Sequence, residues 1–145
     1  MTQVKKAKSK EDQAESLNNG NHTDIVIINA VLESLFSMFS TMMNLTIKPG
    51  TPIPKQGIAA QGEVSGLIGM KAEGSYGSVA LTLTLPTIRT ISMSLFGEEI
   101  ATVGNEAKDL AGELTNMLVG GAKRILSEKG LEFDMQSPQD RKSVV

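Results

Sequence analysis

The chain of 145 residues has no cysteine and only one histidine, His22. The lack of cysteine excludes disulfides, thiolate catalysis and cysteine-ligated zinc, and it fits a cytoplasmic protein. One histidine in a polar stretch cannot provide a Ser-His-Asp triad or a histidine-rich metal site. The sequence therefore predicts no metal site and no cofactor of its own. Any catalysis has to come from carboxylates and amides, or from a partner protein.

Aromatic residues are also scarce, with no tryptophan, one tyrosine and four phenylalanines, and the net charge is −2. Nucleic-acid binding calls for a basic surface and stacking aromatics, so no nucleic-acid partner is expected. The sequence has no Walker loop and no GxGxxG motif. The short basic start lacks the apolar segment of a signal peptide, and the helix expected after it contains polar residues. Neither export nor a membrane span is therefore expected.

The length corresponds to one domain. Residues 1–22 carry charges and amides with almost no large apolar side chain, which predicts a disordered polar tail. We place the folded domain at residues 23–138 and a second polar tail at residues 139–145. Within the domain, a first core helix is expected from an N-cap at Asp24, or alternatively Thr23, to about Asn44.

The middle of the chain changes from helical to extended spacing. Three prolines and two glycines predict a loop or an irregular edge strand at residues 48–57. Alternating apolar residues then predict two strands, at about 62–72 and 75–85, joined by a turn at Glu73-Gly74. In the second strand one face is predicted to be buried, and it consists of Val79, Leu81, Leu83 and Leu85.

The last third of the chain reads as two helices and a strand. Pro86 at the first helical position opens a short helix that stops at Gly97. A long helix is expected from about Glu106 to Lys129, with Gly130 after its end, and residues 131–136 alternate like a final strand. This order predicts an α+β fold in which helices pack on an antiparallel sheet.

The long helix carries the most informative pattern. Asp109, Glu113 and Asn116 share one face, because residues three and four apart stack on a helix. The opposite stripe is apolar and contains Leu110, Leu114, Met117, Leu118 and Ile125. An ordinary solvated face would explain the three polar residues. Gly120 and Gly121 follow on the helix despite their low helix propensity, which suggests that something approaches closely there.

The pattern Asp109-x3-Glu113-x2-Asn116, placed after a strand hairpin and a short helix, resembles the CheX/CheC/FliY family of bacterial chemotaxis phosphatases. In that family an acid or serine is followed by a glutamate and an asparagine, with a proline some twenty residues later, where this chain has Pro138. The segments GLIGMKAEGSYGSVALTLTLP and ISMSLFGEE are also similar to the hairpin and short helix of the family. The resemblance covers residues 24–138.

The resemblance implies a phosphatase that hydrolyses the aspartyl phosphate of a CheY-type response regulator. Glu113 corresponds to the glutamate that engages the lysine of the regulator, and Asn116 to the amide that positions the attacking water. Asp109 takes a supporting role, with a first-turn acid favoured by the helix dipole as the alternative. Gly120, one turn beyond Asn116 on the same stripe, is predicted to belong to the partner-docking face, with packing against a neighbouring helix or strand as the alternative. The Mg²⁺ ion is expected in the regulator and not in this chain.

The resemblance also implies a single site, because Asn29-x3-Glu33-x2-Phe36 in the first helix has phenylalanine at the amide position. It implies a CheX-type homodimer that joins its sheets. Family members usually continue with further strands after the proline, so the C-terminal end of this fold is expected to be shortened, which leaves an open sheet edge. Two alternatives remain: a binding module that docks a receiver domain or a flagellar switch component without hydrolysis, and a domain of this fold with an unrelated role.

Overall fold

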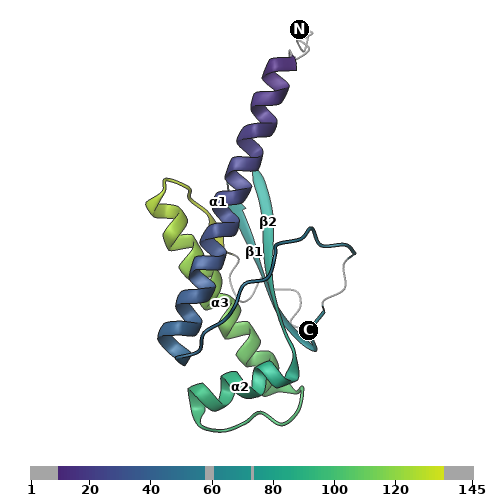
Figure 1. The fold of residues 1–145 in the computed structure, drawn as a ribbon, viewed down its shortest axis with the longest axis vertical. Helices are drawn as coiled ribbons and strands as arrows, with labels where there is room; N and C mark the ends of the chain where they lie inside the picture. Colours follow the sequence, from purple (N-terminus) through teal and green to yellow (C-terminus); the bar gives the residue numbers. More distant parts are fainter. Residues whose placement is uncertain (1–9, 58–60, 73, 136–145) are drawn as a thin grey trace.

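The computed structural model describes residues 10–57, 61–72 and 74–135 (Figure 1). Three helices and three strands follow one another in the predicted order. They are α1 (Lys10–Met43), β1 (Val64–Ala72), β2 (Ser75–Leu83), α2 (Leu85–Phe96), α3 (Asn105–Glu128) and β3 (Asp134–Met135). The strands form one antiparallel sheet in the order β2-β1-β3. The predicted α+β class is confirmed.

The hairpin of β1 and β2 makes up most of the sheet. Its register runs from Val64 opposite Leu83 to Ala72 opposite Ser75, so two residues form the turn, as predicted. Gly74 has φ 74°, a value that residues other than glycine rarely adopt. Glu73, the other predicted turn residue, lies outside the described residues. The residues 48–57 form no regular element, which confirms the predicted loop.

Helices α1 and α3 lie side by side and cover the same face of the sheet (Figure 1). Two groups of buried side chains fill the space between them. The larger group joins the C-terminal part of α1 and α2 to the first half of α3, around Met38, Ile88, Ile91 and Leu114. The smaller group lies around Ala30, Ile68, Val119 and Leu126. Because both groups touch α3, this helix is fixed along most of its length.

The predicted start of the first helix at Asp24, or at Thr23, is wrong. Helix α1 already begins at Lys10, so the disorder predicted for the N-terminal tail does not apply to residues 10–22, and residues 1–9 lie outside the described residues. The segment from Lys10 to Leu17 is rich in good helix formers. Adding residues to an existing helix avoids the unfavourable nucleation step, so the packed part of α1 supports this extension.

Helix α2 begins at Leu85, one residue before the predicted Pro86. Thr84 is the N-cap and its Oγ1 accepts a hydrogen bond from the backbone N–H of Thr87 at 3.4 Å. A carboxylate oxygen of Glu63 accepts the N–H of Leu85 at 2.9 Å and so satisfies one of the unpaired donors of the first turn. The predicted stop at Gly97 is confirmed, with φ 71°.

The final strand is shorter than predicted. Of the described residues 131–135, only Asp134 and Met135 pair with the sheet, opposite Lys71 and Met70. The N–H of Leu131 instead donates to the carbonyl of Leu126 at 2.9 Å and closes the end of α3. Residue 136 and the predicted C-terminal tail lie outside the described residues.

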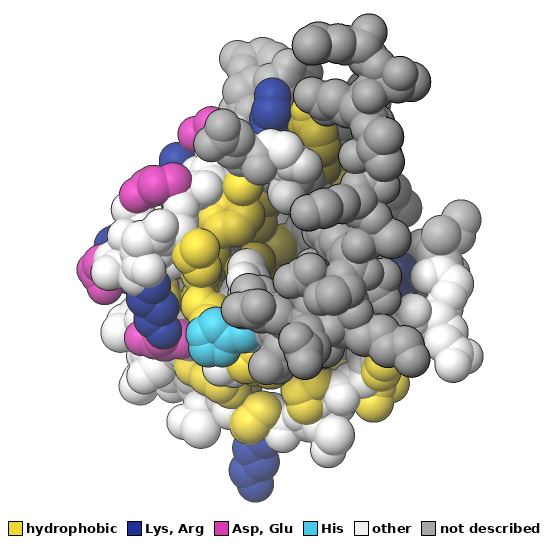
Figure 2. Space-filling view, turned by 90° about the horizontal axis from the view of Figure 1, so that it is seen from above, with side chains coloured by type: hydrophobic (Ala, Val, Ile, Leu, Met, Phe, Trp, Pro, Cys, Tyr) yellow, Lys and Arg dark blue, Asp and Glu magenta, His cyan; other side chains and the backbone are white. Residues whose placement is uncertain are grey.

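By length and composition, one segment of α1 could cross a membrane. His22–Met43 has 22 residues and a mean hydropathy of 1.7, although Ala30, Met38, Phe39 and Met43 are buried in the core. Ile25 and Ile28 are about half exposed, and Figure 2 shows hydrophobic side chains at the surface on this end of the molecule. The polar residues of this helix therefore do not by themselves exclude a membrane span, and the absence of a membrane partner stays a prediction.

Candidate functional site

Helix α3 carries the predicted site residues and is held in place by its buried inner face. Its inner face is buried and consists of Ala107, Leu110, Ala111, Leu114, Thr115, Leu118, Val119, Ala122 and Leu126. Asp109 and Glu113 are exposed on the outer side, and Asn116 and Gly120 are half-buried. The predicted division into an apolar and a polar face is therefore confirmed. The fixed inner face limits how far the outer side chains can move.

Two glycines allow α3 to approach its neighbours. A Cβ atom on Gly66 of β1 would lie 2.1 Å from Oγ1 of Thr115 and 2.7 Å from the carbonyl oxygen of Ala111. A Cβ on Gly121 of α3 would lie 2.2 Å from Oγ of Ser34, and this hydroxyl donates to the carbonyl of Leu118 at 2.7 Å. These contacts set the position of α3 against both the sheet and α1.

Gly120 differs from its neighbour. A Cβ atom added there would meet nothing within 4 Å. The residue lines an open hollow of about 590 Å³ between α1 and α3, together with Ser37, Thr41, Met117, Arg124 and Glu128. The geometry is compatible with the predicted docking face and shows that Gly120 does not serve helix packing. Gly121 is the residue that does.

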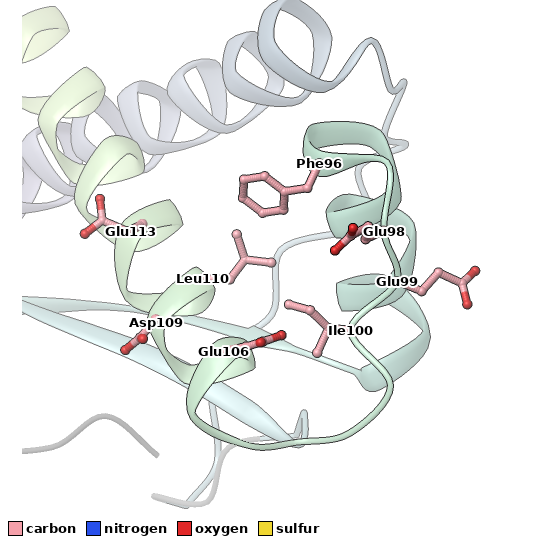
Figure 3. A pocket seen from close by; sticks show the side chains of 8 residues that line it. All are labelled: Phe96, Glu98, Glu99, Ile100, Glu106, Asp109, Leu110 and Glu113. Carbon is pink, nitrogen blue, oxygen red and sulfur yellow. The ribbon is translucent and has the colours of Figure 1, made fainter.

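The N-terminal half of α3 borders a second hollow, which we call the acidic cleft (Figure 3). It measures about 390 Å³ and lies between α3 and the end of α2 with the loop that follows. Its lining consists of Phe96, Glu98, Glu99, Ile100, Glu106, Asp109, Leu110 and Glu113. Two of the predicted site residues, Asp109 and Glu113, thus lie on its rim.

Figure 3 shows how the side chains of the cleft are directed. The ring of Phe96 points into the space between the two helices, and Leu110 and Ile100 face each other across the floor. Glu98 and Glu106 extend towards the interior, whereas Glu99, Asp109 and Glu113 point away from it. Asn116 and Gly120 are not part of this lining. The outer face of α3 is therefore flanked by two separate hollows.

Sequence reasoning missed the contribution of α2 and its loop to this region. The signal was present in the segment LFGEEI, where a phenylalanine and an isoleucine flank two consecutive acids. Its position next to Glu113 depends on how α2 packs, and spacing along the chain does not reveal that. Within residues 10–57, 61–72 and 74–135, no three acidic or histidine side chains are placed to hold a metal ion.

The fold resembles that of solved chemotaxis proteins. A CheC-like superfamily protein from Shewanella sp. PV-4 is 45% identical, with a TM-score of 0.73 over 77% of this chain and 73% of that chain. The chemotaxis protein CheX from Vibrio vulnificus is 40% identical, with a TM-score of 0.70 over 77% and 74%. CheX from Desulfovibrio desulfuricans is 30% identical, with a TM-score of 0.66 over 76% and 73%. None of the curated proteins matches the chain.

These neighbours place the protein in the class of CheC-like chemotaxis proteins. The family described as chemotaxis phosphatase CheX matches residues 64–142, a range that contains the hairpin, α2, α3 and β3. The chain belongs to the CheX family of chemotaxis phosphatases. This confirms the resemblance seen in the sequence, and with it a general phosphatase role in chemotaxis.

Proposed function

We propose that this protein hydrolyses the aspartyl phosphate of a CheY-type response regulator. Glu113 contacts the active-site lysine of the regulator, and Asn116 orients the attacking water. The observation that carries the proposal is the outer face of α3, where an exposed carboxylate and a half-buried carboxamide lie on one side while Leu114 and Thr115 between them are buried. A fixed helix is a suitable support for a group that enters the site of another protein.

In the proposed reaction this chain contributes only a few groups. A carboxamide is a poor base, but it can hold a water in line with the phosphorus through its donor and acceptor atoms. The regulator supplies the phosphoryl group, the lysine and the Mg²⁺ that stabilises the developing charge. Glu113 contributes charge for recognition of the lysine, and Asp109 adds negative charge one helical turn away. This division of labour needs neither histidine nor cysteine from the phosphatase.

The open space at Gly120 supports the same mode of approach. Asn116 must come within hydrogen-bond distance of a water inside the site of the regulator, so the helix surface around it has to come close as well. A side chain at position 120 would project from this surface one turn further along. The lack of one lowers the steric barrier to docking. A cytoplasmic location and a homodimer are part of this proposal and stay predictions.

The proposal is tested with a CheY-type receiver phosphorylated by acetyl phosphate in the presence of Mg²⁺. Loss of the acyl phosphate is followed with and without this protein, and acceleration is expected at substoichiometric amounts. The receivers of the source organism are assayed one by one. Binding without acceleration would point to the alternative of a docking module, and no acceleration with any receiver would refute the enzymatic proposal.

A further inference from the structure

The acidic cleft combines an apolar floor with an exposed aromatic wall. Leu110 is buried and Ile100 half-buried, whereas Phe96 remains 66% exposed with its ring directed into the cleft (Figure 3). Phe96 is the last residue of α2, and the turn at Gly97 fixes it there. A large apolar side chain held in this way can be covered by a partner at a low cost in conformational entropy.

Negative charge is concentrated around this apolar surface. Five carboxylates line the cleft, although the net charge of the whole chain is only −2. None of the five forms a hydrogen bond or ion pair within the described part of the chain. The guanidinium of Arg89 donates to the carbonyl of Ala101 at 2.8 Å and forms no ion pair with any of the five carboxylates. A basic side chain of a partner would therefore meet unpaired carboxylates.

We propose that the acidic cleft is a docking groove for the receiver domain, adjacent to the catalytic residues. It takes a surface segment of the receiver in which a lysine or arginine flanks an apolar side chain. This inference rests on the proposed function. Continuity carries it, because Asp109 and Glu113 line the cleft and also lie on the face that approaches the phosphorylation site. A partner that places its lysine against Glu113 lies next to the cleft, whose opposite wall carries Phe96 and Glu98.

The groove determines affinity and partner choice and leaves the chemical step to Asn116. Aromatic side chains at the centre of interfaces often dominate binding, and clusters of charge raise the rate of encounter. Changes at Phe96 and Glu98 are therefore expected to raise KM and to leave kcat unchanged. Changes at the catalytic amide are expected to lower kcat.

The test uses a CheY-type receiver bound to beryllofluoride, a stable mimic of the phosphorylated form, and measures its Kd for the full-length protein. Phe96→Ala is expected to weaken binding about tenfold. Glu98→Gln is expected to weaken it several-fold, with a smaller loss at high salt. Glu99→Gln is the matched control, because it removes the same charge from the neighbouring residue, whose side chain points away from the cleft.

The outcomes separate this inference from the proposed function. Unchanged Kd for Phe96→Ala and Glu98→Gln would overturn the groove even if the wild-type protein proves to be a phosphatase. Equal losses of affinity for Glu98→Gln and Glu99→Gln would indicate that only the overall negative charge of this region matters, and would also overturn the groove. A changed self-association of Phe96→Ala in sedimentation, with normal receiver binding, would assign the cleft to a second copy of the chain. If Phe96→Ala and Glu98→Gln lose binding while Glu99→Gln does not, the groove is supported. If the wild-type protein at the same time shows no hydrolysis, the proposed phosphatase activity is refuted.

Discussion

At the scale of single residues, the proposed role of Asn116 in hydrolysis can be tested separately from the stability of the fold. The side chain is half-buried on the outer side of α3, and the neighbouring Thr115 and Leu114 carry the packing. Asn116→Ala is expected to abolish the acceleration of receiver dephosphorylation while it changes the free energy of unfolding by less than about 1 kcal/mol. Urea denaturation and the phosphatase assay measure the two effects. A protein that unfolds on this change would show that Asn116 has a structural role.

Glu113 is expected to act on recognition as well as on rate. The side chain is exposed, so Glu113→Ala should leave the fold intact. Loss of its contact with a lysine is expected to weaken receiver binding about tenfold. Increasing the ionic strength from low to about 0.5 M should reproduce part of this loss in the wild type, since a contact at the edge of an interface is screened. Binding that responds to neither change would remove Glu113 from the contact.

The two adjacent glycines offer a matched pair. Gly120→Leu enters open space, and leucine favours the helix over glycine by up to about 1 kcal/mol, so the fold should remain or become slightly more stable. Gly121→Ala brings a Cβ atom to 2.2 Å from the hydroxyl of Ser34 and should cost about 1–3 kcal/mol. Thermal melts test both. Docking should fail only for the stable variant Gly120→Leu, and full phosphatase activity of that variant would refute the docking face.

Some residues of the candidate site could be predicted from the sequence and others could not. The 3.6-residue period of the apolar side chains correctly placed Asp109 and Glu113 on the outside of α3, because the period depends only on local geometry. The different roles of Gly120 and Gly121 could not be predicted, because they depend on where Ser34 of another helix lies. The same holds for Phe96 and Glu98, which reach the cleft only through the packing of α2.

At the scale of elements, the close approach of β1 to α3 holds in place the helix that carries the proposed catalytic residues. It requires Gly66, which faces the backbone oxygen of Ala111 as well as the side chain of Thr115. Since the backbone of a packed helix cannot move aside easily, Gly66→Ala should destabilise the protein by at least about 2 kcal/mol. Gly77→Ala on β2 is the control, because its Cβ would meet nothing within 4 Å.

Chemical denaturation of both glycine variants measures this difference. A second measurement is the phosphatase rate of Gly66→Ala under conditions where it remains folded. The rate should fall, because a displaced α3 moves Asn116 relative to the regulator and catalysis is sensitive to such shifts. Equal stability of the two variants would show that the contact between Gly66 and α3 is not a constraint.

The elements themselves were predictable where the signals are local. The turn at Gly74, the end of α2 at Gly97 and the order of all six elements follow from glycine and from apolar period. The start of α1 was missed, since a polar composition does not distinguish a solvated helix from a coil. The last strand was predicted too long because the hydrogen bond from Leu131 to the end of α3 is not visible in the alternation of residues 131–136.

At the scale of the whole molecule, the sheet is open. Among the described residues, β2 has a strand partner on one side only, and β3 covers β1 only at Met70 and Lys71. Helix α3 packs against β1 and β2 (Figure 1). Unpaired backbone groups on a nine-residue edge strand favour pairing with another chain. The open edge of β2 is where the predicted homodimer would form, and the homodimer stays a prediction.

The homodimer is expected to join its sheets through β2. Ser78 and Ala80 are exposed on this strand, and two copies pairing in antiparallel fashion around Val79 would bring these positions together. The double change Ser78→Lys and Ala80→Lys places like charges across the contact and should convert the dimer to a monomer in sedimentation velocity. The control Ser37→Lys with Thr41→Lys adds the same charge on the exposed side of α1 and should remain dimeric. A wild-type protein that sediments as a monomer at tens of micromolar would refute the dimer, and a dimeric β2 variant would place the contact elsewhere.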